Sequence, residues 1–193
     1  MDSVPDALPV REKSEKSMIL EIIKFTILAL LIVTPFRFFV AQPFIVSGAS
    51  MEPTFDPKEY LVIDELSYRF QKPERGDVVI FRYPQDPSTF FIKRVIALPG
   101  ETVRFEDGTM HITALDGTVH VYDEPYVSGN MRTTRDEETV LHDDEYFVMG
   151  DNRSASSDSR VWGPLPEKYI VGRAYARLYP LSEISFLPGE HRY

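Results

Sequence analysis

The chain has 193 residues, which is enough for one compact domain, or for a small domain with an anchor. Its composition, with 43% hydrophobic and 26% charged residues, excludes wholesale disorder and collagen-like or coiled-coil structure. The absence of cysteine excludes disulfides, thiol catalysis, zinc–thiolate sites and iron–sulfur clusters.

The charge of the chain is unevenly distributed. Its net charge is −9, from 21 basic and 30 acidic residues. Residues 1–46 hold five of each, so the remainder carries the whole negative charge. Nucleic-acid binders normally present a basic face, because phosphate contacts dominate their affinity. We therefore expect no nucleic-acid partner.

A long apolar segment runs from Met18 to Val40. As a helix rising about 1.5 Å per residue, it would cover a hydrocarbon layer of ~30 Å. Lys24 and Arg37 lie toward opposite ends, where their side chains can reach the headgroups. These features predict a single transmembrane helix over 18–40, preceded by a tail over 1–17.

Two other interpretations of this segment are weaker. A cleavable signal peptide needs small residues before the cut, but Phe39 occupies the outer position and Pro43 follows closely. A helix lying on the membrane needs a polar face, and apolar residues surround this one. More basic residues precede the apolar core than follow it, which predicts a cytoplasmic N-terminus and an extracytoplasmic domain over 41–193.

The remainder of the chain predicts a mainly β fold, an antiparallel sheet domain with a small β subdomain at about 102–145. Short runs of β-branched and aromatic residues are separated by glycine- and proline-containing turns. Asp107-Gly108 and Asp116-Gly117 predict the turns of two hairpins. The expected strands are 44–46, 60–63, 77–82, 90–98, 102–105, 110–113, 114–115, 118–122, 145–149 and 169–179.

The first chemical candidate is a serine that follows a predicted strand. Ser50 lies on the turn Ser47-Gly48-Ala49-Ser50, which would expose its hydroxyl and leave backbone N–H groups free to face an oxyanion. An ordinary surface turn would have the same sequence pattern. On this pattern alone, both interpretations stay open.

A serine nucleophile needs a base, and the histidines offer none with recognisable spacing. Lys93 lies in the most hydrophobic stretch outside 18–40, on a predicted strand face shared with Phe91, Val95 and Ala97. Burial there would lower its pKa and give a neutral amine that accepts a proton. The alternative is a lysine whose stem packs while its ammonium group reaches water.

Together these segments resemble the type I signal peptidases, the membrane-anchored Ser/Lys proteases (the leader peptidase family) that remove signal peptides from exported proteins. Four motifs occur in the order of that family, after one N-terminal apolar segment. They are SGASMEPTF at 47–55, RGDVVIF at 75–81, FIKRVIALPGE at 91–101 and GDNRSASSDSRVWG at 150–163.

The resemblance implies a catalytic dyad and one departure from the pattern of some relatives. Ser50 would be the nucleophile and Lys93 the general base. Some family members carry a serine oxyanion donor where this chain has Gly48, so the Ser50 backbone N–H is the expected donor and the second donor is open, with Ser47 a conceivable substitute.

The resemblance also implies residues that support the dyad. The Ser156 hydroxyl would orient the Lys93 amine. Asp158 would brace the last motif, with Arg160 or Arg94 as its ion-pair partner. For Asp151, Asn152 and Arg153, a structural role in the turn and a catalytic role both stay open.

Relatives cut after small residues in an Ala-x-Ala pattern, and they act on exported preproteins at the outer surface of the cell membrane. The resemblance therefore implies contact with the lipid bilayer and a functional link to the export machinery, without a metal or organic cofactor. The residues matching pocket-lining positions, which are equally compatible with a core, are Phe44, Val46, Met51, Phe55 and Ile92.

Two other functions compete with this one. A Ser/Lys autoprotease of the SOS-repressor type shares the dyad chemistry, but such proteins are soluble and bind DNA, which the apolar segment and the acidic charge oppose. A catalytically inactive, membrane-anchored binding module is opposed by the intact set of Ser50, Lys93 and Ser156.

Overall fold

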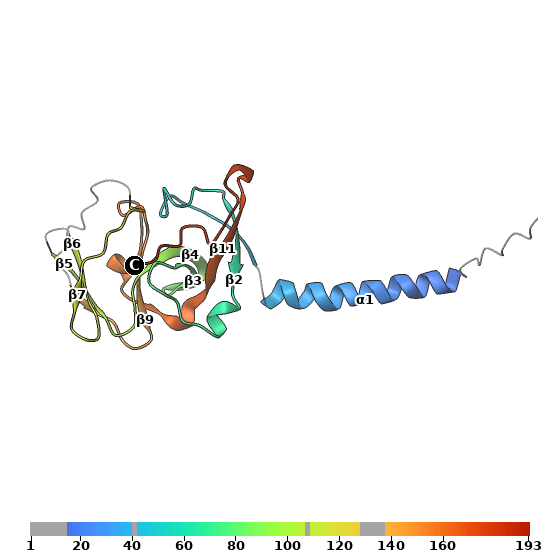
Figure 1. Cartoon of the computed structure of the whole chain (residues 1–193), viewed down its shortest axis with the longest axis horizontal. Coiled ribbons are helices and arrows are strands. Elements are labelled where there is room, and N and C mark those ends of the chain that lie inside the picture. The colour runs from blue at the N-terminus through green and yellow to red at the C-terminus, as the bar shows by residue number, and fades with distance from the viewer. Residues whose placement is uncertain (1–14, 40–41, 107–108, 128–137) are drawn as a thin grey trace, which may run out of the picture. The chain divides into compact units, whose positions relative to one another are not determined.

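The computed structural model describes residues 15–39, 42–106, 109–127 and 138–193. The chain divides into two compact units, residues 1–38 and residues 39–193. The long helix α1, Glu15–Phe39, lies in the first unit except for its last residue, and the strands that the structure describes lie in the second. Figure 1 shows both units, with α1 and most of the longer strands labelled.

Helix α1 is one continuous helix, as predicted for this segment. Large apolar side chains from Met18 to Val33 are exposed on all of its sides. Within the part of the chain that the structure describes, no helix is both long and apolar enough to cross a membrane. The transmembrane span predicted over 18–40 is therefore not supported, and most of the predicted tail over 1–17 lies outside the described residues.

The second unit is built from strands and short helices. The strands are β1 Gln42–Ile45, β2 Tyr60–Asp64, β3 Val78–Tyr83, β4 Asp86–Ala97, β5 Thr102–Glu106, β6 Thr109–Thr113, β7 Val119–His120, β8 Glu138–Val140, β9 Glu145–Met149, β10 Leu165–Pro166, β11 Ile170–Tyr179 and β12 Ser185–Phe186. The short helices are η1 Ser67–Arg69, α2 Ser159–Trp162, η2 Glu167–Tyr169 and η3 Leu181–Glu183.

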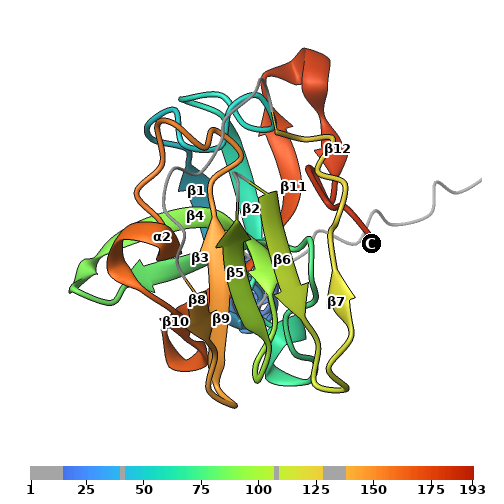
Figure 2. The ribbon, with the colours of Figure 1, turned by 90° about the vertical axis from the view of Figure 1, so that its left-hand side faces the viewer.

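The strands form two antiparallel sheets. The larger sheet has eight strands in the order β1-β2-β11-β3-β4-β9-β10, with β12 paired to β11. The smaller sheet has the order β7-β6-β5-β8, and Figure 2 shows β5, β6 and β7 side by side. The predicted mainly antiparallel β fold is confirmed.

Strands β3 and β4 lie inside the larger sheet, and the first four residues of β3 and the last six of β4 are buried on both faces. Val78 and Ile80 of β3 pack into one apolar cluster, whereas Val79 and Phe81 pack into another on the opposite face. This explains why β3 has an uninterrupted apolar sequence, because an alternating pattern would leave one face polar. In the β3–β4 pairing, Val79 lies opposite Lys93 and Val78 opposite Arg94.

The smaller sheet shares its core with the larger one. Side chains of β5 and β6, including Val103 and Ile112, pack in one cluster with Phe147 and Met149 of β9. The turn predicted at Asp107-Gly108 lies outside the described residues. The second predicted hairpin differs in its pairing, because β7 pairs with β6 and not with a separate strand at 114–115.

Candidate active site

The candidate nucleophile, Ser50, lies between an exposed turn and a segment whose apolar side chains are buried. The chain leaves β1 through Val46, and Gly48 adopts a φ of +80°, in the left-handed region that favours glycine. After Ser50, Met51 and Phe55 are fully buried. The Phe55 N–H donates to the Met51 carbonyl at 3.0 Å, which closes a turn just beyond the serine. Ser50 is thus presented at the surface by residues fixed in the core.

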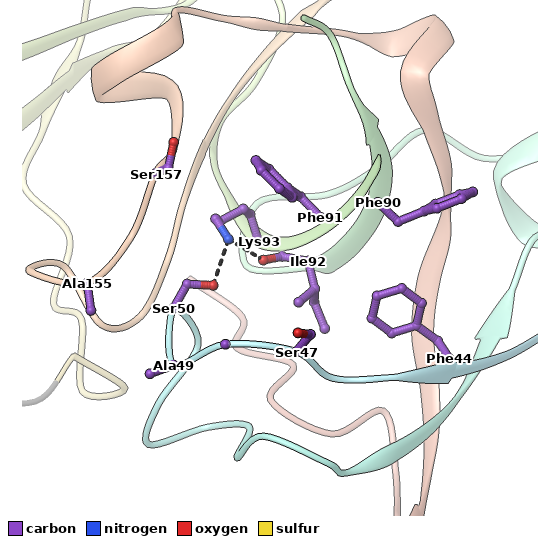
Figure 3. Close-up of a pocket in the computed structure, with 11 residues that line it drawn as sticks. Phe44, Ser47, Ala49, Ser50, Phe90, Phe91, Ile92, Lys93, Ala155 and Ser157 are labelled. Carbon is purple, nitrogen blue, oxygen red and sulfur yellow. Dashed lines mark hydrogen bonds between the residues drawn. The ribbon is translucent and has the colours of Figure 1, made fainter. Parts of the chain in front are cut away.

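Lys93 of β4 directs its amine at this serine. Its Nζ lies 2.7 Å from Ser50 Oγ and 2.8 Å from the Ile92 carbonyl oxygen (Figure 3). The side chain is buried, with 3% of the residue exposed, and Nζ lies 5.2 Å from the centre of the Phe91 ring. Among the described residues, no carboxylate forms an ion pair with this amine.

This environment favours the neutral form of the amine. Burial lowers the pKa of Lys93 to about 8, and the charges of Asp158 and Asp151 oppose the shift without cancelling it. At pH 8 about half of the molecules therefore hold an amine that can accept a proton from the Ser50 hydroxyl at 2.7 Å.

A cavity of about 230 Å³ opens beside the Ser50–Lys93 pair. Its lining combines the exposed turn with residues of β1, β4 and the last motif, as Figure 3 shows. The lining residues are Phe44, Ser47, Gly48, Ala49, Ser50, Phe90, Phe91, Ile92, Lys93, Ala155 and Ser157. The cavity is mostly apolar at its walls and offers hydroxyls at its edge, which suits an extended peptide with small side chains.

A buried ion pair lies behind the dyad. Arg94 donates from Nε to Asp151 Oδ1 at 2.8 Å and from Nη2 to Asp151 Oδ2 at 2.6 Å, and both side chains are fully buried. Thr54 Oγ1 donates to the same carboxylate at 2.5 Å. The Arg94 guanidinium also donates to the carbonyls of Gly76 and Gly189. The pair therefore ties together the nucleophile segment, β4 and the turn that begins at Gly150.

That turn contacts the backbone of the nucleophile directly. The Asn152 N–H donates to the Ser50 carbonyl oxygen at 3.1 Å. Gly150 has no room for a side chain, because a Cβ there would lie 2.3 Å from both the Ser50 carbonyl oxygen and Ser156 Oγ. Close packing of three segments at this point requires glycine.

Asp158 is the centre of the last motif. Arg160 donates to both of its carboxylate oxygens, at 2.8 and 2.7 Å, and the Gly150 N–H donates to it at 3.0 Å. Burial raises the pKa of the Asp158 carboxyl, but the hydrogen bonds and charge of Arg160 outweigh it, so the pKa lies below its usual range. The Ser156 hydroxyl, close to the same carboxylate but outside hydrogen-bonding geometry, acts in the same direction.

Comparison with known proteins shows the family to which this chain belongs. A model of the family described as signal peptidase, peptidase S26, matches residues 19–179. The chain belongs to this family. It is 34% identical to signal peptidase I of Leptolyngbya laminosa, over 95% of this chain and 91% of that protein. It is 33% identical to signal peptidase I P of Bacillus subtilis subsp. natto, over 90% of this chain and 96% of that protein.

A crystal structure of a signal peptidase I from Enterococcus faecalis V583 is also similar. It is 33% identical, matches 53% of this chain and 97% of that chain, and has a TM-score of 0.44. Membership of the family makes the chain a serine endopeptidase, of the type I signal peptidase kind. The type I signal peptidase resemblance drawn from the four motifs is confirmed.

The structure brings together part of the predicted site. Ser50 and Lys93 are in contact, and Phe44 and Ile92 line the cavity beside them. Val46, Met51 and Phe55, the other residues matching pocket-lining positions, are buried in the core with at most 2% exposed and are not among the residues that line this cavity. In this structure these side chains support the serine turn by packing beneath it.

The residues expected to support the dyad make one of the expected contacts and not another. Of the two partners considered for Asp158, the structure places Arg160 there, whereas Arg94 pairs with Asp151. Ser156 Oγ is buried and has no hydrogen-bond partner among the described residues, so it does not contact the Lys93 amine by a hydrogen bond. Gly48 and Ser47 both line the cavity, as an oxyanion donor would have to.

Two contacts were not predicted from the sequence. Thr54 lies in the nucleophile motif, so its hydroxyl bond to Asp151 could have been sought there. Glu124, which pairs with Arg153, lies outside all four motifs and has no local signal. Within the described residues, no group of three or more His, Cys, Asp or Glu side chains could hold a metal ion.

Proposed function

We propose that this protein is an endopeptidase that removes N-terminal signal peptides from exported preproteins, using Ser50 as nucleophile and Lys93 as general base. The observation that supports it most is the 2.7 Å contact between Lys93 Nζ and Ser50 Oγ in a buried, apolar setting. The relatives named signal peptidase I support the class of substrate.

The reaction follows from this geometry. The Ser50 oxygen attacks the scissile carbonyl carbon while the neutral Lys93 amine takes the hydroxyl proton. The oxyanion forms where the Ser50 backbone N–H can donate to it, with Ser47 as a candidate for a second donor. Lys93 then returns its proton to the leaving amine, and the same amine activates the water that hydrolyses the acyl-enzyme.

The cavity supports a preference for small residues before the scissile bond, of the Ala-x-Ala type. Its volume of about 230 Å³ lies at the small end for ligand sites, and Phe44 and Ile92 are among its walls. A wall of large side chains leaves shallow depressions that accept alanine and exclude bulky residues. A substrate would lie there as an extended segment.

We propose further that α1 attaches the enzyme to a lipid bilayer, near the export machinery that delivers its substrates. Its apolar side chains from Met18 to Val33 are exposed on all sides, which in water is unfavourable at about 25 cal/mol per Å². Attachment would raise the effective concentration of a membrane-bound preprotein. A cytoplasmic N-terminus and an extracytoplasmic catalytic unit stay predictions, which protease protection of sealed vesicles would test.

The test is cleavage of a preprotein in detergent or vesicles by the full chain and by Ser50→Ala and Lys93→Ala. We expect both variants to lose cleavage while keeping the circular dichroism spectrum of the original protein. Because only the neutral amine acts as a base, the rate should rise about tenfold per pH unit up to about pH 8 and then level off. Near-normal turnover by either variant would refute the dyad.

A further inference from the structure

A second charged pair lies next to the candidate site, with its carboxylate supplied by the segment that follows β7. Glu124 accepts from Arg153 Nη1 at 2.9 Å through Oε2, and from Nη2 through Oε1. The side chains are 16% and 6% exposed, so the pair is largely withdrawn from water. The Tyr126 hydroxyl donates to Glu124 Oε1 at 2.9 Å and helps to fix the carboxylate.

Arg153 connects Glu124 to the turn at 150–153, which lies beside the nucleophile. Its Nε donates to the Gly150 carbonyl oxygen at 3.1 Å, and its own carbonyl accepts from Arg160 Nη2 at 2.8 Å. Both ends of the four-residue turn are therefore held, one through the side chain of Arg153 and the other through its backbone.

The turn in turn holds the nucleophile. Asn152, inside it, donates its N–H to the Ser50 carbonyl oxygen at 3.1 Å. A continuous series of contacts thus runs from Glu124 through Arg153 and the turn to the backbone of Ser50. Two hydrogen bonds join Glu124 to Arg153, and one hydrogen bond forms each later step. The turn is also held by Asp151, which pairs with Arg94, and by the Gly150 N–H, which donates to Asp158, so loss of Glu124 removes one of its restraints.

The charge of Glu124 matters because Arg153 is buried. Burial lowers the pKa of Arg153, but the hydrogen bond and charge of Glu124 outweigh it, and the pKa is raised. Without that carboxylate, a buried guanidinium lacks its counter-charge and is strongly destabilised where it lies. It would move toward water and release the Gly150 carbonyl.

We propose that Glu124 is a positioning residue for the nucleophile: through Arg153 it fixes the turn that holds Ser50 against Lys93. This rests on the proposed function, because it assumes that Ser50 is the nucleophile. A displacement of the serine affects the chemical step more than substrate binding. The expected signature is therefore a loss in kcat with little change in KM.

The chain offers a matched control in another buried Arg–Glu pair. Arg75 contacts both oxygens of Glu101, at 2.6 and 2.8 Å, with side chains 10% and 9% exposed. Arg75 also donates to the Ile96 carbonyl and lies 4.6 Å from the centre of the Tyr122 ring. In the described structure, neither Arg75 nor Glu101 forms a hydrogen bond or ion pair with the turn at 150–153. We expect loss of this pair to lower stability by the same mechanism and to leave Ser50 in place.

The experiment compares kcat and KM of the full chain in detergent micelles, on an internally quenched peptide with an Ala-x-Ala site, from pH 6 to 9.5. The variants are Glu124→Ala, Glu124→Gln, Glu124→Asp and the control Glu101→Ala. We expect Glu124→Ala to lose at least tenfold in kcat, with KM within twofold. The apparent pKa of the rate should stay unchanged, because Lys93 is untouched, and Glu124→Asp should recover part of the loss.

Glu101→Ala should keep kcat within twofold at a temperature where both proteins are folded by circular dichroism. The proposal is overturned if Glu124→Ala keeps kcat within twofold, if its loss lies in KM, or if Glu101→Ala loses as much. Should Glu124→Ala not fold, Glu124→Gln decides by the same criteria. It removes the counter-charge of Arg153, and the acceptor that its amide oxygen keeps favours folding. Ser50→Ala and Lys93→Ala in the same assay separate the two proposals: activity in either refutes the dyad, whereas full kcat in the Glu124 variants alone refutes only this inference.

Discussion

The two faces of β4 treat neighbouring cationic side chains in opposite ways. Lys93 lies on the face shared with Phe91 and Val95, and its amine contacts a hydroxyl and a carbonyl. Arg94, on the other face, contacts both oxygens of Asp151, two carbonyls and the ring of Tyr126. Both residues are buried, at 3% and 0% exposed. Burial without an adjacent carboxylate produces a base, whereas burial with one produces a structural cation.

Replacing the base with a permanent cation tests this contrast most severely. In Lys93→Arg the guanidinium keeps its proton at neutral pH and cannot accept one from Ser50. We expect preprotein cleavage to fall by at least about 1,000-fold, as when one member of a catalytic set is removed. The measurement is single-turnover cleavage at pH 8. Lys72→Arg, at an exposed ion pair with Glu167, is the control and should keep full activity.

Removing the structural cation should instead cost stability. Arg94→Met leaves the fully buried Asp151 carboxylate with the Thr54 hydroxyl and without its ion pair. We expect the free energy of unfolding to fall by about 3–5 kcal/mol, measured by urea denaturation at pH 7. Arg94→Met combined with Asp151→Asn should recover part of this loss, since the buried charge is gone. A double variant less stable than the single one would contradict the role of Arg94 as a counter-ion.

Removing the base should have the opposite effect on stability. The pKa of Lys93 is about 8 in the folded protein against an ordinary value of 10.5. Below pH 8 both states are protonated and burial of the charge opposes folding fully; between pH 8 and 10.5 only the unfolded state keeps the proton, so stability rises with pH. The full difference is on the order of 3 kcal/mol.

We therefore expect Lys93→Met to be more stable than the original protein below pH 8, by less than that amount because two hydrogen bonds are lost. The advantage should shrink as the pH rises from 8 toward 10.5. Urea denaturation at pH 6.5, 8 and 9.5 measures it. An advantage that grows with pH would mean that the lysine is not buried in its charged form at neutral pH.

The sequence predicted the antiparallel sheets because their strands are long enough to have a pattern. β8, β10 and β12, with three, two and two residues, were missed, since such segments contain too few residues for alternation to be visible. Alternation along β4 correctly separates Lys93 from Arg94, but it says nothing about what each face packs against. That depends on segments brought together by the fold.

The candidate site was predictable where a motif contains it and not where it depends on long-range contacts. Ser50 and Lys93 lie 43 positions apart, yet each lies inside a motif, and the order of the motifs along the chain indicates the pair. Met51 and Phe55 were expected near the pocket because they match pocket-lining positions of relatives, and an apolar residue at such a position suits a pocket or a core equally well; both are fully buried here. Glu124 and Arg153 are 29 positions apart, and one acidic residue among many in the chain is not distinguished by its neighbours.

The weakest expected effect concerns a carboxylate that acts on Lys93 through its charge without contacting it. Asp158 does not contact Lys93 in an ion pair, yet its charge raises the pKa of that amine against the effect of burial. In Asp158→Asn this charge is lost, while the amide oxygen can still accept from the Gly150 N–H at 3.0 Å. The Arg160 guanidinium, now without its counter-charge, acts in the same direction on Lys93.

We therefore expect the apparent pKa of the cleavage rate to move below about 8 by less than about one pH unit, whatever happens to the maximal rate. The measurement is the pH dependence of kcat/KM from pH 5.5 to 9.5, with Glu101→Gln as a control that leaves the pKa in place. An unchanged or raised apparent pKa would show that burial alone sets the protonation of Lys93. A lowered apparent pKa would show that the charge of Asp158 keeps the pKa of Lys93 higher than burial alone would set it.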